Sequence, residues 1–181
     1  KRYRRRIAMI WAVIPAAGSG MRSGSDIPKQ YRPLLGKPMI EYSLDILAQH
    51  PDIDGIILAL APDDARWQHI SQWFNTPLRT CLGGMRRSDS VLAAIEALDD
   101  VVHNDTWLLV HDAARPCVRF EDLNRLIEAA CVHPVGGLLA GPMKDTVKRG
   151  DADHQVEGTL DRSALWRAFT PQLFPARSLK R

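Results

Sequence analysis

Short apolar runs that alternate with segments of helical spacing constrain the fold of this chain more than any other feature. Five runs rich in apolar and β-branched residues predict strands at residues 10–15, 53–60, 78–82, 107–111 and 135–140. Four intervening segments predict helices at residues 39–49, 63–74, 88–98 and 120–133. Strands that are apolar throughout and alternate with helices are typical of a sheet covered on both faces. The sequence therefore predicts an α/β fold with a mostly parallel sheet.

In such a sheet, right-handed crossovers bring the strand-to-helix loops to one edge, where ligands bind. The loop after the first predicted strand reads Pro15-Ala16-Ala17-Gly18-Ser19-Gly20-Met21-Arg22, and Pro28-Lys29-Gln30 follows it. Small residues let backbone N–H groups approach a polyphosphate, and Arg22 and Lys29 add positive charge. A phosphate-binding loop is one interpretation, and a glycine-rich turn without a ligand is the other.

The loop after the fourth predicted strand reads His111-Asp112-Ala113-Ala114-Arg115-Pro116. A carboxylate at the carboxyl end of a central parallel strand is well placed to hold Mg²⁺, which proteins usually bind through one or two carboxylates and substrate phosphates. Asp112 is therefore a candidate metal ligand. Pairing with Arg115, or capping of the next helix, is an equally good explanation of its presence.

The loop after the third predicted strand reads Gly83-Gly84-Met85-Arg86-Arg87-Ser88-Asp89-Ser90 and leads into a helix. Its glycines permit close approach of the backbone to a ligand. Ser90 either hydrogen-bonds a base edge or belongs to the first turn of the helix. Arg86 and Arg87 are interpreted as a solvated pair rather than as ligands.

Composition and charge argue against several other classes of protein. The 181 residues are 45% hydrophobic and 25% charged, as expected of one globular domain. Five of the 24 positive residues lie within residues 1–6, and the other 19 face 21 acidic residues, a balance of −2 that argues against a nucleic-acid partner. No run approaches the roughly 20 apolar residues of a membrane span. Three widely spaced cysteines favour a cytoplasmic location without disulfides or a zinc site.

Two segments stand apart from the alternating pattern. Residues 1–9 are interpreted as a basic N-terminal extension rather than a signal peptide, because the apolar run that follows is needed as the first strand. Residues 141–160 change to a polar alternation with a turn near Gly150, which is typical of an exposed hairpin.

Six motifs occur along the chain in the order P-A-A-G-x-G-x-R, P-K-Q-Y, G-G-x-x-R-x-x-S-V, V-H-D-A-A-R-P, D-T-V-K-R and D-R-x-x-L-W-x-A-x-T-P-Q. With these motifs, over residues 10–175, the chain resembles the cytidylyltransferases that act on 2-C-methyl-D-erythritol 4-phosphate. The resemblance implies a Rossmann-like nucleotidyltransferase domain at residues 10–140 and a β-arm at 141–160 that is exchanged in a homodimer. It also implies a return to the core at 161–181, with the C-terminal part of the family's fold absent.

The same resemblance assigns roles to individual residues. The cytidine nucleotide would be surrounded by Pro15, Ala16, Ala17, Gly18, Gly84, Ser90 and Ala113. Arg22 and Lys29 would bind its phosphates, and Asp112 would hold Mg²⁺. Methylerythritol phosphate would be bound by Arg115 and Thr146, together with Arg162 and Thr170 from the partner's arm. The implied catalytic set is Arg22, Lys29, Asp112 and Arg162.

The implied reaction transfers CMP from CTP to 2-C-methyl-D-erythritol 4-phosphate and releases pyrophosphate, within non-mevalonate isoprenoid synthesis. Because the attacking phosphate is already an anion, the obstacle is charge repulsion, and no covalent intermediate is expected. His111 is accordingly interpreted as structural, and Trp166 as a packing anchor. Two alternatives stay open: a cytidylyltransferase for another polyol phosphate such as ribitol 5-phosphate, and a truncated, non-catalytic fragment that binds nucleotide or dimerises through its arm.

Overall fold

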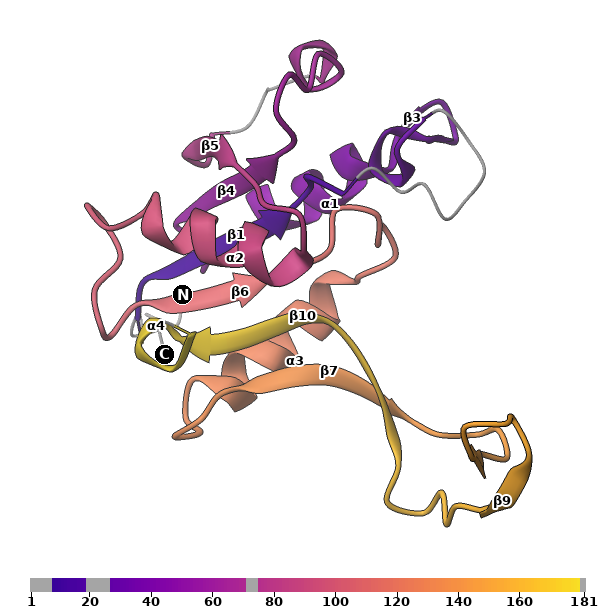
Figure 1. Ribbon diagram of the computed structural model, residues 1–181. Coiled ribbons are helices and arrows are strands. Elements are labelled where there is room, and N and C mark those ends of the chain that lie inside the picture. The colour runs from indigo at the N-terminus through magenta and orange to yellow at the C-terminus, as the bar shows by residue number, and fades with distance from the viewer. Residues whose placement is uncertain (1–7, 19–26, 71–74, 180–181) are drawn as a thin grey trace.

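The structure is a computed structural model that describes residues 8–18, 27–70 and 75–179, and one mixed sheet lies at its centre (Figure 1). The six strands lie in the order β5-β4-β1-β6-β10-β7. In chain order they are β1 Ile10–Pro15, β4 Gly55–Leu60, β5 Leu78–Leu82, β6 Trp107–Val110, β7 Gly137–Pro142 and β10 Trp166–Pro175. Strand β1 pairs in parallel with β4 and β6, and β4 with β5, whereas β10 is antiparallel to β6 and β7. The predicted α/β fold with a mostly parallel sheet is confirmed.

Helices pack on both faces of this sheet. They are α1 Met39–Ala48, α2 Arg87–Glu96 and α3 Phe120–Ala130, with a short α4 at Ala176–Leu179. Successive side chains of a strand point to opposite faces. In β1, Ile10, Ala12 and Ile14 are buried in one core with α1 and α3, whereas Trp11 and Val13 are buried in a second core with α2. A strand buried on both sides has no solvated face, which is why β1 is apolar throughout.

The helix predicted at residues 63–74 is wrong for the part of this segment that the structure describes. Residues 63–70 contain a single 3-10 turn, η3 Trp67–His69, and residues 71–74 lie outside the described residues. Asp63 has a φ of 56°, a left-handed conformation that interrupts a right-handed helix. Trp67 and Ile70 are both buried in the core, so a single turn already brings the apolar residues at helical spacing to the same side.

Strand β10 has no counterpart among the predicted strands. It inserts between β6 and β7, and its residue Leu173 is fully buried. Pro171 and Pro175 lack the N–H group that a strand ladder uses, and the register with β7 shifts between Ala168 and Gln172. These prolines and the neighbouring polar residues interrupt the apolar alternation by which a strand is predicted from sequence.

A hairpin projects from the sheet. Strands β8 Lys148–Gly150 and β9 Val156–Thr159 pair with each other in a separate two-stranded sheet. Figure 1 shows them at the end of an arm that is reached through β7 and β10. The exposed hairpin predicted within residues 141–160 is thus present in the structure.

The remaining elements are short. The 3-10 turn η2 Lys29–Tyr31 is followed by a small hairpin of β2 Pro33–Leu34 and β3 Lys37–Pro38. Among the helices of the described residues, none has both the length and the apolar character needed to cross a membrane.

Candidate active site

Loops that follow β1, β5 and β6 line one cavity at the carboxyl ends of these strands. Its volume is about 590 Å³, within the range of small-molecule sites. The lining residues are Pro15, Ala16, Ala17, Gly18, Lys29, Gln30, Gly84, Met85, Arg86, Arg87, Ser90, Asp112, Ala113 and Ala114. This set includes all seven residues that the resemblance places around the cytidine nucleotide, together with Asp112. Of the two predicted phosphate-binding residues it contains Lys29, whereas Arg22 lies outside the described residues.

The side chain of Gln30 holds the loop that follows β1 in place. Its side chain is buried, and its Nε2 atom donates hydrogen bonds to the carbonyl oxygens of Ala16, at 2.7 Å, and Gly18, at 3.2 Å. Carbonyl oxygens would repel a phosphate, so their engagement by Gln30 favours an anion at this loop. The sequence gives Gln30 no role, although its place directly after Lys29 in the P-K-Q-Y motif is the signal that would have found it.

Gly83 brings the second loop against the first. A Cβ atom at this position would lie 2.5 Å from the Cβ of Ala17 and 2.8 Å from the Oγ of Ser90, so only glycine fits here. The Ser90 hydroxyl is buried and accepts a hydrogen bond from the Gly84 N–H at 3.1 Å. It also lies 3.2 Å from the carbonyl oxygen of Arg86. Ser90 therefore shapes the glycine loop from the first turn of α2.

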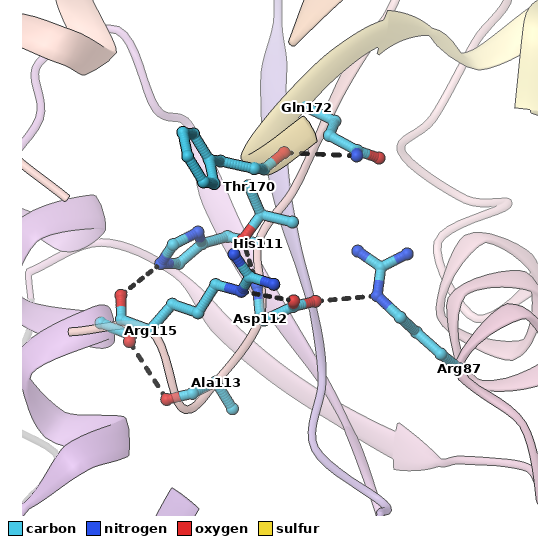
Figure 2. A network of polar contacts seen from close by, with 9 residues as sticks. Arg87, His111, Asp112, Ala113, Arg115, Thr170 and Gln172 are labelled. Atoms are coloured by element: carbon cyan, nitrogen blue, oxygen red, sulfur yellow. Dashed lines mark hydrogen bonds and ion pairs between the residues drawn. The ribbon is translucent and has the colours of Figure 1, made fainter. Parts of the chain in front are cut away.

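Asp112 joins the loops through two ion pairs, as Figure 2 shows. Its Oδ1 atom lies 2.8 Å from the Nε of Arg87, and its Oδ2 atom lies 3.0 Å from the Nε of Arg115. Its backbone N–H donates to the Oγ1 of Thr170 at 3.3 Å. Arg87 is exposed, as expected of a solvated residue, but its guanidinium also pairs with the Asp112 carboxylate, a contact that the sequence does not indicate. The alternative pairing of Asp112 with Arg115 is present.

His111 and Ser43 hold the backbone of the Asp112 loop. The His111 ring is fully buried, and its Nε2 lies 3.1 Å from the carbonyl oxygen of Arg115, to which it donates in the neutral ring. Its Nδ1 has no hydrogen-bond partner among the described residues. Burial, the largest cause, lowers the pKa of His111 to about 4. From α1, the hydroxyl of Ser43 donates to the carbonyl oxygen of Ala113 at 3.1 Å.

A second cavity, of about 440 Å³, adjoins Asp112. Its lining residues are Arg115, Pro116, Cys117, Val118, Asp122, Leu139, Phe169 and Thr170. Arg115 and Thr170, both predicted to bind the acceptor substrate, therefore share one cavity. The placement of Thr170 on the arm is wrong, because β10 continues past the arm into the sheet and Thr170 is buried against Asp112 of its own chain.

Two further residues predicted to bind the acceptor lie on the arm. Thr146 and Arg162 are exposed, and neither is among the residues that line the two cavities. Arg162 donates from Nη1 to the carbonyl oxygen of Lys144 at 2.5 Å, a contact within the arm. Trp166, predicted to be a packing anchor, is 62% exposed in this single chain.

The donor atoms near Asp112 fit a metal that is bound mainly by substrate. Among the described residues, there is no cluster of three or more His, Cys, Asp or Glu side chains that could hold an ion. Asp112 is the one carboxylate among the residues that line the larger cavity, and its side chain is 26% exposed. Mg²⁺ is commonly held in this way, by one or two carboxylates with phosphate oxygens and water completing its shell.

A mostly parallel sheet whose carboxyl edge carries a small-residue loop, a lysine and an aspartate around one cavity has the architecture of a nucleotidyltransferase. The family model described as 2-C-methyl-D-erythritol 4-phosphate cytidylyltransferase matches residues 10–181, and the chain belongs to this family.

Individual relatives agree with this assignment. The chain is 52% identical to the 2-C-methyl-D-erythritol 4-phosphate cytidylyltransferase of Xylella fastidiosa (strain 9a5c), over 95% of its own length and 74% of the relative's. It is 47% identical to the Stenotrophomonas maltophilia (strain R551-3) protein of the same name, with coverages of 96% and 75%. A crystal structure of a 4-diphosphocytidyl-2C-methyl-D-erythritol synthase matches with a TM-score of 0.80 and 35% identity, with coverages of 95% and 78%. The Francisella tularensis cytidylyltransferase matches with a TM-score of 0.78 and 35% identity, with coverages of 96% and 75%.

Proposed function

We propose that this chain catalyses the reaction for which its family is named. It transfers CMP from CTP to 2-C-methyl-D-erythritol 4-phosphate, releases pyrophosphate and gives 4-diphosphocytidyl-2-C-methylerythritol for non-mevalonate isoprenoid synthesis. The observation that carries the proposal is the convergence of three distant loops on one cavity, lined by the small residues, the lysine and the aspartate of the family's motifs.

CTP would occupy the larger cavity. Ala16, Ala17 and Gly18 have little or no side chain to keep a triphosphate from the backbone, and Lys29 lies in the same lining. We propose that Arg22 adds a second positive charge near the phosphates. The glycine loop that Ser90 shapes would contact the base, since Gly84 and Ser90 line the same cavity.

The acceptor would bind in the second cavity, where Arg115 and Thr170 lie beside Asp112. One anionic oxygen of its phosphate attacks the α-phosphorus of CTP, a P–O bond forms, and the bond to pyrophosphate breaks. The transferred group needs orientation and neutralisation of charge rather than a protein nucleophile. Single-turnover reactions should therefore yield no nucleotidylated protein.

Asp112 is the residue that would hold Mg²⁺. When bound, Mg²⁺ would offset the negative charge that separates the two phosphate-bearing substrates. Asp112 also holds Arg87 and Arg115, so its carboxylate organises the positive charge of both cavities whether or not a metal is present.

We also propose that the chain acts as a homodimer in the cytoplasm. Val156 of the arm is 65% exposed and Trp166, at the start of β10, is 62% exposed, and the arm of a partner subunit would cover both. Thr146 and Arg162 line neither cavity of their own chain, so a role in acceptor binding requires that they come from a partner. The three cysteines are unpaired, which fits a reducing compartment.

Release of pyrophosphate from CTP, Mg²⁺ and methylerythritol phosphate tests the proposal. Replacement Asp112→Asn should lower kcat/KM by at least about a hundredfold, because it removes a charge that orients two arginines and binds the metal. Asp100→Asn is the matched control, since Asp100 also pairs with an arginine, Arg79, but lies outside both cavities. The control should retain wild-type activity.

Three outcomes separate the alternatives. Faster turnover of ribitol 5-phosphate than of methylerythritol phosphate would assign the chain to a different acceptor. Binding of CTP without turnover of either acceptor would favour a nucleotide-binding protein without catalysis. Equal activity of Asp112→Asn and the wild type would refute the site described above.

A further inference from the structure

The guanidinium of Arg87 has N–H donors that are available to bind an anion. It is the first residue of α2, and its Nε donates to the Oδ1 of Asp112 at 2.8 Å. A guanidinium has five N–H donors in a planar fork, and this contact uses one of them. The two terminal nitrogens of Arg87 have no hydrogen-bond partner among the described residues, and in Figure 2 the only dashed contact of this side chain is the one from Nε.

Asp112 fixes the direction of this fork. Its other oxygen is held by the Nε of Arg115, so the carboxylate lies between two guanidinium groups and cannot turn toward one without leaving the other. Side chains restrained in this way lose less conformational entropy when they bind a ligand. Arg87 is therefore oriented before any substrate arrives.

The surroundings of Arg87 indicate which side an anion would occupy. Arg87 borders the larger cavity, where the charged lining residues are Lys29, Arg86, Arg87 and Asp112, an excess of positive charge. It also borders a smaller cavity of about 220 Å³, whose lining is mainly apolar and includes Val91, Leu92 and Ile95. A multiply charged anion belongs in the first cavity, because an apolar wall offers it no hydrogen bonds.

We propose that Arg87 binds the phosphates of the nucleotide in the larger cavity and that Asp112 positions it to do so. The inference rests on the proposed function, since it takes CTP as the occupant of that cavity. Because Asp112 uses only Nε, Arg87 can donate from its terminal nitrogens to a phosphate oxygen while it keeps its contact with the carboxylate. A lysine carries its three N–H donors on one nitrogen and lacks the planar fork, so it cannot present separate donors to the two partners at the same spacing.

Calorimetric titration with CTP and with cytidine, without acceptor, tests this role independently of turnover. Arg87→Ala and Arg87→Lys should each weaken CTP binding by at least about tenfold, the loss expected of a charge-assisted hydrogen bond. Binding of cytidine, which has no phosphate, should change by less than about twofold on the same grounds. Arg79→Ala is the matched control, because it breaks an arginine–aspartate pair outside the cavities and should alter neither affinity.

The CTP loss should persist when EDTA replaces Mg²⁺, since Arg87 would contact the phosphates directly. A loss seen only with Mg²⁺ would overturn the phosphate contact and leave Arg87 as a residue that merely orients Asp112. Equal weakening of cytidine and CTP would also overturn it, because the glycine loop would then be the part disturbed. Unchanged CTP binding in both variants would refute the inference alone, whereas a wild-type chain that binds no CTP would refute the proposed function with it.

Discussion

At the scale of single residues, His111 shapes the site without being accessible to a ligand. Its buried ring holds the carbonyl oxygen of Arg115 and so closes the turn that carries Asp112. Its Nδ1 atom is buried without a hydrogen-bond partner among the described residues, and the negative charge of Asp112 offsets only part of the effect of burial. Burial therefore lowers the pKa of His111 to about 4, and the ring is neutral at physiological pH.

We predict that His111 makes the folded chain sensitive to mild acid. Between pH 6.5, its ordinary pKa, and its folded pKa of about 4, the unfolded chain binds a proton on this residue that the folded chain does not. The free energy of unfolding should therefore fall as the pH decreases through this window, by up to roughly 3 kcal/mol at its lower end. Urea unfolding followed by tryptophan fluorescence at several pH values measures this dependence.

Replacement His111→Gln isolates the effect, because glutamine keeps an N–H donor and does not titrate. This variant should be less stable than the wild type at pH 7.5, owing to poorer packing, but should lose less stability between pH 7 and pH 4.5. His103→Gln makes the same substitution at an exposed position and serves as the control. Parallel curves for the wild type and His111→Gln would contradict the assignment.

At the scale of elements, the site depends on how closely two loops approach. Gly83→Ala would place a Cβ atom 2.5 Å from the Cβ of Ala17, closer than two non-bonded carbon atoms can lie. The Cβ of Ala17 is attached directly to the backbone, so it cannot rotate away to relieve the clash. We expect the loops to separate, with a loss of about 1–3 kcal/mol in stability and about tenfold or more in CTP affinity. Urea unfolding and calorimetry measure the two effects.

Two further variants show whether the clash itself is responsible. Gly158→Ala makes the same chemical change on the arm, where a Cβ would meet nothing within 4 Å, and it should affect neither quantity. Adding Ala17→Gly to Gly83→Ala removes the closer contact and should recover part of the CTP affinity. No recovery would mean that Ser90, rather than Ala17, sets the spacing of the loops.

Much of this element-level arrangement could be predicted because each piece has a local signal. Strand β1 is buried on both faces and is therefore apolar at every position from Ile10 to Ile14. The glycines and small residues after β1 and β5 mark loops where the backbone must come close to something. Since parallel strands share an edge, the convergence of these loops on one cavity follows from the predicted fold.

The parts that could not be predicted depend on tertiary contacts. Residues 63–74 have apolar residues at helical spacing, which is why a helix is predicted there. The left-handed backbone conformation of Asp63 cannot be inferred from that spacing. Strand β10 is stabilised by its neighbours on both sides, despite Pro171. Arg87 and Asp112 lie 25 positions apart, and their pairing depends on the packing of α2 across β1, the neighbour of β6 in the sheet.

At the scale of the whole molecule, the residues predicted to bind the acceptor are divided between two places. Arg115 and Thr170 lie in a cavity of the sheet domain, whereas Thr146 and Arg162 lie on the exposed arm that Figure 1 shows projecting from it. An active site that uses all four therefore needs the arm of a second chain. This arrangement predicts that one chain can supply what another lacks.

Mixing two inactive variants tests that prediction. In a dimer of Asp112→Asn with Arg162→Ala, the site on the second chain has its own Asp112 and receives Arg162 from the first chain. Random assembly makes about half of the dimers mixed, each with one intact site of two, so an unfractionated mixture should recover about a quarter of the wild-type activity and purified mixed dimers about half. Pyrophosphate release by mixed dimers, co-purified through two different tags, measures the recovery.

The matched control mixes Asp112→Asn with Arg115→Ala. Both of these residues belong to the cavities of their own chain, so each site of the mixed dimer carries one defect and no activity should return. Recovery with Arg162→Ala but not with Arg115→Ala is the pattern that arm exchange requires. If neither mixture recovers although mixed dimers form, Arg162 must act in the site of its own chain. The arm would then have to fold back toward the cavities of that chain, whose linings do not include Arg162 in this structure.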